Sequence, residues 1–216
     1  MMNITVIGAN GQIGKLLTQY LAQETEHEVT AVIRKPEQAE ALEQLGAKTA
    51  LADLEGTVED LTKVVTGSDA IVFAAGSGGS TGDDKTLLID LDGAVKCMEA
   101  AEQAGVSRFV LVSALFAYDR AKWSQEIKPY YVAKHYADRL LEASSLDYTI
   151  VRPGGLKNDP GTGSIQIAEK LSDSGSIPRA DVAKVIAHLI DNKNTYRKGY
   201  DVISGDQPVE EALKGL

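Results

Sequence analysis

The sequence predicts an α/β fold in which a doubly wound, mostly parallel sheet lies between two layers of helices. Two observations predict this fold. Short apolar runs rich in β-branched residues alternate along the chain with segments of helical periodicity. The first apolar run is followed at once by Gly8, Gly11 and Gly14, at a spacing of three, and then by a helical segment. Because crossovers between parallel strands are right-handed, a doubly wound sheet of three layers is the natural arrangement.

The elements can be placed in order along the chain. Runs with the length and composition of buried strands are Ile4–Ile7, Val29–Ile33, Lys48–Ala52, Ala70–Ala75, Phe109–Ser113, Tyr148–Arg152 and Tyr200–Ile203. Segments with helical spacing are Gln12–Ala22, Pro36–Leu45, Val58–Val65, Thr86–Ala104, Tyr131–Ser144 and Asp181–Asp191. The connections 76–85, 114–129 and 154–178 are longer than the fold requires, and each leaves the carboxyl end of a strand. Since ligands bind at that edge, these three loops are expected to form a small substrate-side region.

Length and charge limit the classes of protein to consider. The 216 residues suffice for one α/β domain spanning 1–216. A net charge of −9 argues against binding to nucleic acid, and no apolar run approaches the length needed to span a bilayer. The single cysteine, Cys97, fits a reducing compartment and is interpreted as a core residue. We therefore expect a cytoplasmic protein, a monomer or weak dimer, with no nucleic-acid or membrane partner.

The glycine-rich segment after the first strand is the strongest functional signal. In a strand–turn–helix context, Gly8 permits a sharp turn and Gly11 lets the backbone approach a pyrophosphate. Gly14 lets the helix lie close to the strand, so that the helix N-terminus faces the phosphates. The alternative is a glycine-rich turn in an unrelated α/β protein. The predicted dinucleotide-binding loop comprises Gly8, Asn10, Gly11, Gln12, Ile13 and Gly14.

The end of the second strand indicates which dinucleotide is bound. An NAD-specific site places an acid there to bind the ribose hydroxyls, whereas this chain has Arg34 and Lys35. Two cations suit the 2′-phosphate of NADP, so NADPH is expected to bind better than NADH. The alternative is that both side chains belong to a solvated turn. Further cofactor contacts are predicted at Asp53 and Leu54, although the acid also suits a turn, and at the small residues Ala74, Ala75 and Gly76.

Taken in order, several short motifs resemble the short-chain dehydrogenase/reductase superfamily. They are Gly-Ala-Asn-Gly-Gln-Ile-Gly at 8–14, Arg34, Ala-Asp-Leu at 52–54, Ala-Ala-Gly at 74–76, Val-Ser at 112–113, a Tyr-x-x-x-Lys, and Arg-Pro-Gly at 152–154. The segment Pro178–Ala183 also resembles the atypical branch, which contains small NmrA-like and epimerase-type NAD(P)H-binding proteins. The resemblance spans the whole chain and implies a Rossmann-like fold.

The resemblance also implies a set of catalytic residues. In the superfamily a serine orients the substrate carbonyl, a tyrosine transfers the proton, and a lysine four residues later binds the ribose and lowers the pKa of the tyrosine. Ser113 is the matching serine, although a serine at a strand end is also an ordinary turn residue. Two pairs have the Tyr-x-x-x-Lys spacing, Tyr118 with Lys122 and Tyr130 with Lys134. The second pair follows a proline typical of a helix start, so Tyr130 and Lys134 are the candidates. The alternative role for Tyr130 is a structural aromatic.

Other positions complete the predicted site. Asp90 stands where standard members of the superfamily have an asparagine; it is predicted to pair with Lys134, to hold water, or to face solvent. Pro153 and Gly154 are implied to place backbone beside the nicotinamide. His135 is expected at the surface, and no histidine or cysteine spacing suggests a metal site.

The sequence thus predicts an NADP-dependent oxidoreductase of the atypical short-chain type that acts on an unidentified small carbonyl or quinone-like substrate. Two alternatives remain open. One is a non-catalytic NADP(H)-binding redox sensor that acts through a protein partner. The other is a flavin or quinone reductase that does not need the tyrosine. A nucleotide-sugar epimerase is less favoured, because about 60 residues follow the sixth strand and they are too few for a substrate domain.

Overall fold

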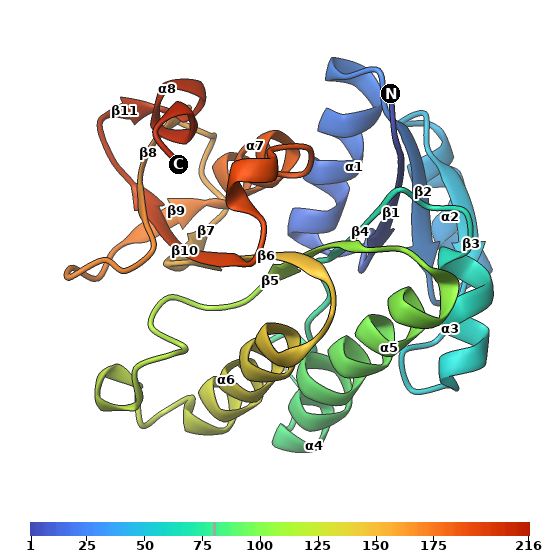
Figure 1. Cartoon of the computed structure of the whole chain (residues 1–216), viewed down its shortest axis with the longest axis horizontal. Coiled ribbons are helices and arrows are strands. Elements are labelled where there is room, and N and C mark those ends of the chain that lie inside the picture. The colour runs from blue at the N-terminus through green and yellow to red at the C-terminus, as the bar shows by residue number, and fades with distance from the viewer. Residues whose placement is uncertain (80) are drawn as a thin grey trace.

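The computed structural model describes residues 1–79 and 81–216 and shows a three-layer α/β fold (Figure 1). The strands are β1 Asn3–Ile7, β2 Glu28–Ile33, β3 Lys48–Leu51, β4 Ala70–Phe73, β5 Arg108–Val112, β6 Asp147–Pro153, β7 Gly155–Lys157, β8 Ser164–Ala168, β9 Ser176–Pro178, β10 Lys198–Ser204 and β11 Gln207–Pro208. The α-helices are α1 Gln12–Glu24, α2 Ala39–Glu43, α3 Val58–Val65, α4 Asp83–Lys85, α5 Ala94–Ala104, α6 Lys128–Ala143, α7 Arg179–Leu189 and α8 Val209–Lys214. A π-helix, η2 Thr86–Gly93, precedes α5, and 3₁₀ turns occupy η1 Pro36–Gln38, η3 Arg120–Lys122 and η4 Lys193–Thr195.

The main sheet has the strand order β11-β8-β10-β6-β5-β4-β1-β2-β3. From β10 to β3 every neighbouring pair is parallel, and the chain reverses direction across the sheet between β1 and β4. β8 is antiparallel to β10, and β11 is antiparallel to β8. The predicted doubly wound, mostly parallel, Rossmann-like sheet in one domain is therefore confirmed. Its reversal point is where the carboxyl ends of neighbouring strands leave room for a ligand.

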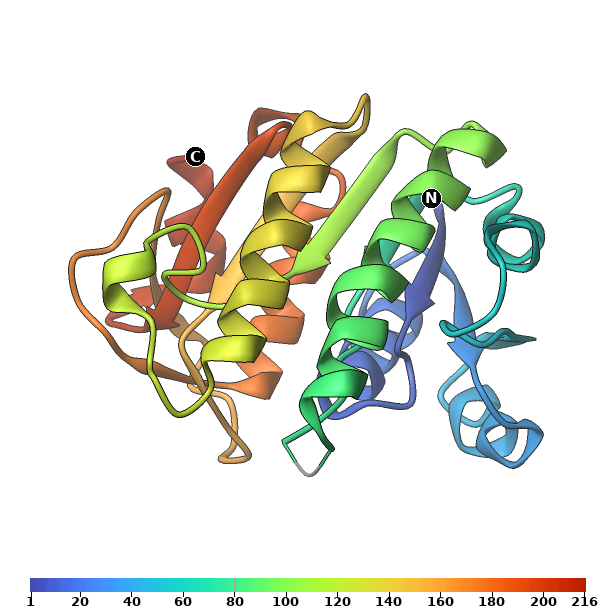
Figure 2. The ribbon, with the colours of Figure 1, turned by 90° about the horizontal axis from the view of Figure 1, so that it is seen from below.

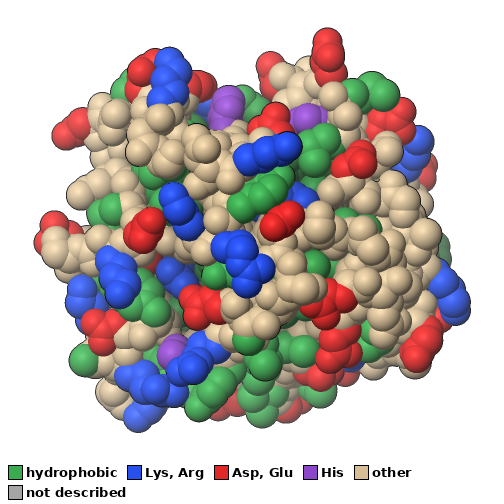
Figure 3. Space-filling view, in the orientation of Figure 1, with side chains coloured by type: hydrophobic (Ala, Val, Ile, Leu, Met, Phe, Trp, Pro, Cys, Tyr) green, Lys and Arg blue, Asp and Glu red, His purple; other side chains and the backbone are tan. Residues whose placement is uncertain are grey.

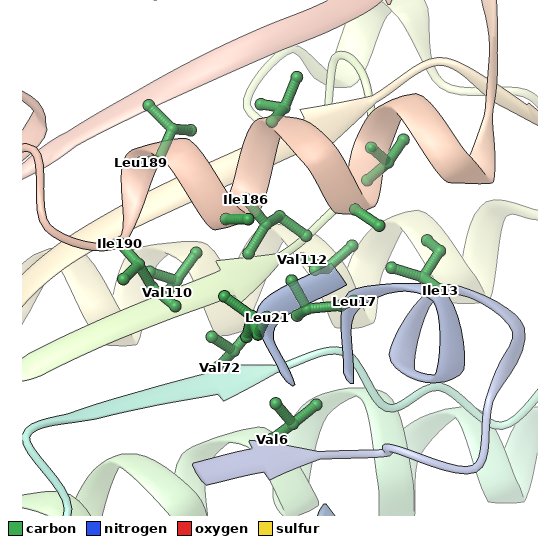
Figure 4. Packing of buried hydrophobic residues seen from close by; sticks show 14 of the residues in the cluster. Val6, Ile13, Leu17, Leu21, Val72, Val110, Val112, Ile186, Leu189 and Ile190 are labelled. Carbon is green, nitrogen blue, oxygen red and sulfur yellow. The ribbon is translucent and has the colours of Figure 1, made fainter. Parts of the chain in front are cut away.

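Helices cover both faces of the sheet (Figure 2), and the side chains of each strand alternate between two cores. In β5, Val110 and Val112 point into the core beneath α1 and α7, which Figure 4 shows. Phe109 and Leu111 point into the core beneath α3, α5 and α6. Because the central strands are buried on both faces, they read in the sequence as continuous apolar runs.

The segment predicted as the loop 154–178 contains regular structure, so that prediction was wrong in part. β7 and β9 form a small two-stranded sheet, and β8 joins the main sheet beside β10. Each of these strands has only three to five residues, and they pair with segments distant in the chain, so local periodicity does not reveal them. The loop 76–85 contains α4, and residue 80 of that loop lies outside the described part of the chain.

Acidic and basic side chains are interspersed over the face seen in Figure 3, with no broad area of one sign. Among residues 1–79 and 81–216, no helix combines the length and the apolar character that crossing a membrane would demand.

Arg108, at the start of β5, is buried and ties the second half of the sheet to α7. Its guanidinium donates to the carbonyl oxygens of Leu189 and Ile190, each at 2.7 Å, at the C-terminal end of α7. It also donates to the carbonyl of Asp147 and the hydroxyl of Thr149, each at 2.8 Å. Burial lowers the pKa of Arg108 to about 10, which leaves it charged at neutral pH. One cation thus satisfies helix-end carbonyls that would otherwise be buried without partners.

We expect Arg108→Met to lower the free energy of unfolding by about 3–5 kcal/mol, because several buried acceptors lose their donor. Urea unfolding followed by circular dichroism measures this. The control is Arg139→Met on the exposed side of α6, for which a change within about 0.5 kcal/mol is expected. Equal effects of the two substitutions would contradict the bridging role of Arg108.

Candidate functional site

The turn between β1 and α1 is packed so tightly that it requires glycine. Gly8 has φ +83°, and a Cβ on it would lie 2.5 Å from the backbone nitrogen of Ala75. A Cβ on Gly14 would lie 2.8 Å from Cα of Ala9 and would also meet the carbonyl oxygen of Gly8. The N–H of Gly11 donates to that same oxygen at 2.9 Å. The first and third glycines therefore act by close packing, as predicted for a dinucleotide-binding loop.

The N-terminus of α1 is available to an anion. Gly11 is its N-cap residue and provides no side-chain cap, and the first turn contains no acidic side chain. The free N–H groups and the positive end of the helix dipole are therefore not occupied by a carboxylate of the chain itself. This end of the helix, together with the glycine turn, fits the pyrophosphate of a dinucleotide.

A cleft of about 360 Å³ opens beside this turn, at the carboxyl edge of the sheet. Its lining comes from the ends of β1, β2, β3 and β4 and from the helical segment after β4. The lining residues are Ile7, Gly8, Asn10, Gly11, Val32, Ile33, Arg34, Gln38, Ala52, Asp53, Leu54, Ala75, Gly76, Ser77, Thr81, Lys85 and Ile89. Of the predicted cofactor residues, eight line the cleft: Gly8, Asn10, Gly11, Arg34, Asp53, Leu54, Ala75 and Gly76. The others, Gln12, Ile13, Gly14, Lys35, Ala74, Lys134, Pro153 and Gly154, are not part of this lining.

The two cations that follow β2, Arg34 and Lys35, have different surroundings. The side-chain oxygen of Gln38 accepts hydrogen bonds from the backbone N–H groups of Arg34 and Lys35 at 3.0 and 3.1 Å, which fixes the turn. Arg34 then forms part of the cleft wall. Lys35 is not part of the lining; its side chain is 57% exposed, and its Nζ lies 3.9 Å from Oε1 of Glu37. Of these two cations, only Arg34 lines the cleft, whose lining also contains Lys85.

Four polar residues of the cleft, Gln38, Ser77, Thr81 and Lys85, were not predicted from the sequence. Gln38 lies four residues after Arg34, and that spacing within a short turn was the available signal. Ser77 and Lys85 belong to the loop after β4, where pattern is weakest. Lys85 reaches across to Glu55, with its Nζ 2.6 and 2.8 Å from the two carboxylate oxygens. This ion pair joins the segments after β3 and β4 at the rim of the cleft. Asp53, beside it, accepts the N–H of Glu55 at 3.0 Å and so also serves its turn.

The predicted catalytic residues Lys134 and Asp90 form a buried ion pair next to this cleft. Nζ of Lys134 lies 3.1 Å from Oδ1 of Asp90 and donates to the carbonyl oxygen of Val112 at 3.1 Å. The two side chains are 4% and 1% exposed, so Asp90 does not face solvent. Its second oxygen, Oδ2, accepts the N–H of Ser77 at 2.9 Å. Asp90 therefore links Lys134 to the backbone that lines the dinucleotide cleft.

The local geometry explains how Asp90 reaches this position. It lies in the π-helix η2, whose wider turn is a feature often found at functional sites. Gly76 has no side chain where a Cβ would be 3.1 Å from the Asp90 carboxylate. Gly93, one turn later, leaves room for Leu54, whose Cβ would lie 3.3 Å from an added Cβ. At Gly93, therefore, η2 packs against the loop after β3.

Tyr130 opens the same face of α6 that carries Lys134, one turn earlier. Nζ of Lys134 lies 5.6 Å from the centre of the Tyr130 ring. Burial raises the pKa of Tyr130, and the nearby charge of Lys134 lowers it by less. The pKa of Lys134 is lowered by burial but raised more by Tyr130, Asp90 and Asp138, so it stays protonated. Lys134 therefore lowers the pKa of Tyr130, as predicted, but burial raises that pKa by more. Tyr130 is protonated at neutral pH.

Ser113 lies directly after β5 and is buried. Its N–H donates to the carbonyl oxygen of Val151 at 2.7 Å, while its hydroxyl oxygen makes no hydrogen bond to the described residues. Beside it lies Asp138, one turn after Lys134, paired with Arg152 at 2.8 Å. Asp138 was not among the site residues predicted from the sequence. The i+4 spacing of Tyr130, Lys134 and Asp138 was the signal available.

The other Tyr-x-x-x-Lys match is structural. The hydroxyl of Tyr118 donates to Oδ2 of Asp201 at 2.8 Å, and Nζ of Lys122 donates to the carbonyl oxygen of Ser172 at 3.2 Å. These two hydrogen bonds hold the loop after β5 against β10 and against the segment between β8 and β9. Cys97 is fully buried in the core, as predicted, and burial raises the pKa of its thiol.

The prediction that His135 lies at the surface requires correction. His135 is buried, because its Nδ1 bonds the carbonyl oxygen of Ala117 at 2.9 Å and its ring lies against Trp123. Its sequence neighbours gave no sign of a loop folding back over it. Gly154 is closely packed, since a Cβ there would lie 2.9 Å from the side chain of Ile203. Its small size thus serves packing against β10.

Comparison with known proteins shows the family to which this chain belongs. The profile of the NAD(P)H-binding family matches residues 8–193. The chain belongs to that family. It is 54% identical over 215 residues to an uncharacterized sugar epimerase of Bacillus subtilis, with all of both chains covered. A structure from Bacillus halodurans, provisionally assigned as an NAD-dependent epimerase/dehydratase, has a TM-score of 0.95 and 42% identity, again with all of both chains covered. The anaerobillin reductase ChuY of Escherichia coli O157:H7 has a TM-score of 0.80 and 26% identity, covering 94% of this chain and 98% of that one.

These comparisons confirm the resemblance to the superfamily and the binding of NAD(P)H. They describe a family of oxidoreductase-like and epimerase-like Rossmann proteins.

We expect Gly8→Ala to raise the dissociation constant for NADPH at least tenfold, because the added Cβ must displace the backbone at Ala75 in the wall of the cleft. Isothermal titration calorimetry measures the change. Gly67→Ala is the matched control, since Gly67 has φ +86° but its Cβ would meet nothing within 4 Å. Alanine is strained by the positive φ at both positions, but only Gly8→Ala adds a steric clash. An unchanged dissociation constant in Gly8→Ala would contradict the proposed cradle.

Proposed function

We propose that this protein is an NADPH-dependent reductase of a small carbonyl or quinone-like compound. The observation that carries the proposal is the buried ion pair of Lys134 and Asp90, which lies beside the half-buried ring of Tyr130. Through Ser77 it is hydrogen-bonded to the wall of a cleft that fits a dinucleotide. A buried lysine paired with an acid, next to a phenol, is costly to maintain unless the arrangement serves a purpose.

The chain's residues have separate tasks in this reaction. Bound NADPH supplies the hydride. Tyr130, kept protonated by its raised pKa, donates the proton to the substrate oxygen. Lys134 stabilises the phenolate that remains, and Asp90 favours the charged form of Lys134. Ser113 donates its hydroxyl hydrogen to the substrate carbonyl and so anchors it.

Two further features support a reductase in preference to an epimerase. The chain after β6 completes the main sheet with β10, β8 and β11 and covers it with α7 and α8. It does not build a separate domain of the size that a nucleotide sugar requires. Among the similar proteins, the anaerobillin reductase shows that a member of this fold and size is a reductase.

The preference for NADPH over NADH rests on Arg34. Arg34 lines the cleft directly after β2, where an NAD-specific site has an acid that binds the ribose. A planar guanidinium forms paired hydrogen bonds with a phosphate.

Arg34→Ala is expected to raise the dissociation constant for NADPH by roughly tenfold to a hundredfold and to leave that for NADH nearly unchanged, because a charge-assisted hydrogen bond contributes about 1.5–3 kcal/mol. Fluorescence titration with each coenzyme measures both values. Lys35→Ala is the matched control, since that side chain is outside the cleft lining and should have little effect. Equal affinities of the wild type for NADPH and NADH would refute the assignment.

The proposed chemistry predicts that Tyr130→Phe lowers kcat by about 10²- to 10⁴-fold while leaving the affinity for NADPH unchanged, because only the proton donor is lost. Oxidation of NADPH is followed by absorbance with a panel of aldehydes, ketones, quinones and flavins. Tyr131→Phe is the matched control, because the Tyr131 ring stacks on Trp123 and is expected to serve packing. Equal losses in the two variants would remove the special role of Tyr130.

A second candidate, a redox sensor that binds NADP(H) without turnover, is favoured by one observation. Lys134 is already engaged by Asp90 and by the carbonyl of Val112, whereas the dinucleotide cradle is complete. Tight NADPH binding with no turnover across the panel would support the sensor. Turnover that is the same in wild type and Tyr130→Phe would instead support a flavin or quinone reductase.

A further inference from the structure

The loop after β3, residues 52–57, contributes one wall of the dinucleotide cleft and is attached to the helices that follow β4. Leu54, which lines the cleft, lies next to Gly93 of η2, where an added Cβ would be 3.3 Å from the Cβ of Leu54. The carbonyl oxygen of Gly56 accepts a hydrogen bond from Nζ of Lys96, on α5, at 3.1 Å. Gly93 and Lys96 are not part of the cleft lining, so these two contacts support the wall from outside the cleft.

The third attachment of this loop is the ion pair between Glu55 and Lys85, and it is the one that reaches the cleft. Nζ of Lys85 lies 2.6 and 2.8 Å from the two carboxylate oxygens of Glu55. Lys85, the last residue of α4, lines the cleft, whereas Glu55 does not. The two side chains are 39% and 32% exposed, so the pair is in contact with water. An ion pair of this exposure is weak, and it therefore opens and closes readily.

Opening of this pair would loosen the wall of the cleft. Its two partners lie 30 residues apart, on separate segments, so the pair joins one segment to the other. The N–H of Glu55 donates to Oδ1 of Asp53 at 3.0 Å, and Asp53 lines the cleft. The N–H of Gly56 donates to the carbonyl oxygen of Asp53, also at 3.0 Å. Because these bonds make residues 53–56 a tight turn, a displacement of Glu55 also displaces Asp53.

We propose that the Lys85–Glu55 ion pair is a clasp that retains the dinucleotide in its cleft. With the pair closed, Asp53 and Leu54 are held against the ligand. With the pair open, this wall yields and the dinucleotide leaves. The inference goes beyond the proposed function, because it concerns retention of the coenzyme and applies equally to a reductase and to a sensor.

A direct attraction between Lys85 and a phosphate of the coenzyme predicts the opposite response at Glu55. In that case the carboxylate competes with the phosphate for the ammonium group, and its removal would slow the release of NADPH. In a clasp, the carboxylate and the ammonium group act together, so removal of either one speeds release. The sign of the effect at Glu55 therefore decides between the two.

Lys85→Met and Glu55→Ala test the clasp. We expect each substitution to raise the rate constant for NADPH release by about twofold to fivefold, the range that a single exposed ion pair supports. The double variant should release NADPH no faster than the single variants, because both substitutions break the same interaction. Release is measured by stopped-flow fluorescence after the NADPH complex is mixed with excess NADP⁺. The same factor is expected for NADH, because the 2′-phosphate is assigned to Arg34 and not to the clasp.

Lys48→Met is the matched control. Nζ of Lys48 lies 2.6 Å from Glu28, and this exposed pair joins the starts of β3 and β2, at the edge of the sheet opposite the cleft. Its loss should leave the release of NADPH unchanged. Slower or unchanged release in Glu55→Ala, additive effects in the double variant, or an equal effect of Lys48→Met would overturn the proposal. Failure of the wild type to bind NADPH would overturn it as well.

A measurement on the ligand-free protein tests whether the pair holds the wall. The N–H groups of Glu55 and Gly56 should exchange with solvent about twofold to fivefold faster in Lys85→Met than in wild type, and at the wild-type rate in Lys48→Met. Amide hydrogen exchange followed by NMR measures this, and equal rates in wild type and Lys85→Met would overturn the inference. Binding of NADPH without turnover of any compound in the panel would refute the proposed function, while the release rates would still decide the clasp.

Discussion

The buried ion pair between Lys134 and Asp90 is the interaction on which the proposed site depends. A lysine ammonium with 4% exposure is tolerated only if its charge is compensated and its hydrogens are bonded, and Asp90 and the carbonyl of Val112 do both. The pair joins α6 to η2 across the end of β5. It thereby holds Tyr130 on one side and, through Ser77, the wall of the dinucleotide cleft on the other. Loss of either partner would leave an uncompensated buried charge.

Other buried charges on the α6 face are also compensated by a partner. Asp138 is compensated by Arg152, and Asp201 on β10 accepts the hydroxyl of Tyr118 and the N–H of Leu171 at 2.8 and 3.0 Å. Asp201 therefore fastens both long segments that follow β5 and β6. Buried charge on this face connects the sheet to its loops, whereas the opposite face, beneath α1 and α7, is packed with aliphatic side chains (Figure 4). The opposite face also buries one charge, Arg108, which donates to the carbonyl oxygens at the C-terminal end of α7.

The proposed chemistry follows from two opposing effects on the pKa of Tyr130. Burial raises its pKa more than Lys134 lowers it, so the phenol remains an acid. An acid in this place favours reduction, in which the tyrosine gives up a proton. Asp90 contributes to this balance, because its negative charge opposes formation of the phenolate and at the same time keeps Lys134 protonated. The acid at position 90, where standard members of the superfamily have an asparagine, therefore has an electrostatic consequence.

The sequence by itself determined the parts of this protein that depend on local pattern. Runs such as Ile4–Ile7 and Phe109–Ser113 predicted central strands to within a residue or two, because strands buried on both faces are continuously apolar. Gly8 and Gly14 were identifiable because only glycine fits a turn packed against Ala75 and Ala9. Tertiary structure alone decided the rest. β8 exists because it pairs with β10, more than 30 residues later, and local propensity carries no record of that partner. Arg34 lines the cleft and Lys35 does not, although Gln38 accepts the backbone N–H of both. Asp138 became part of the site, and His135 became buried, through contacts with segments distant in the chain. Burial and charge pairing are properties of such contacts, and they arise only when the chain is folded.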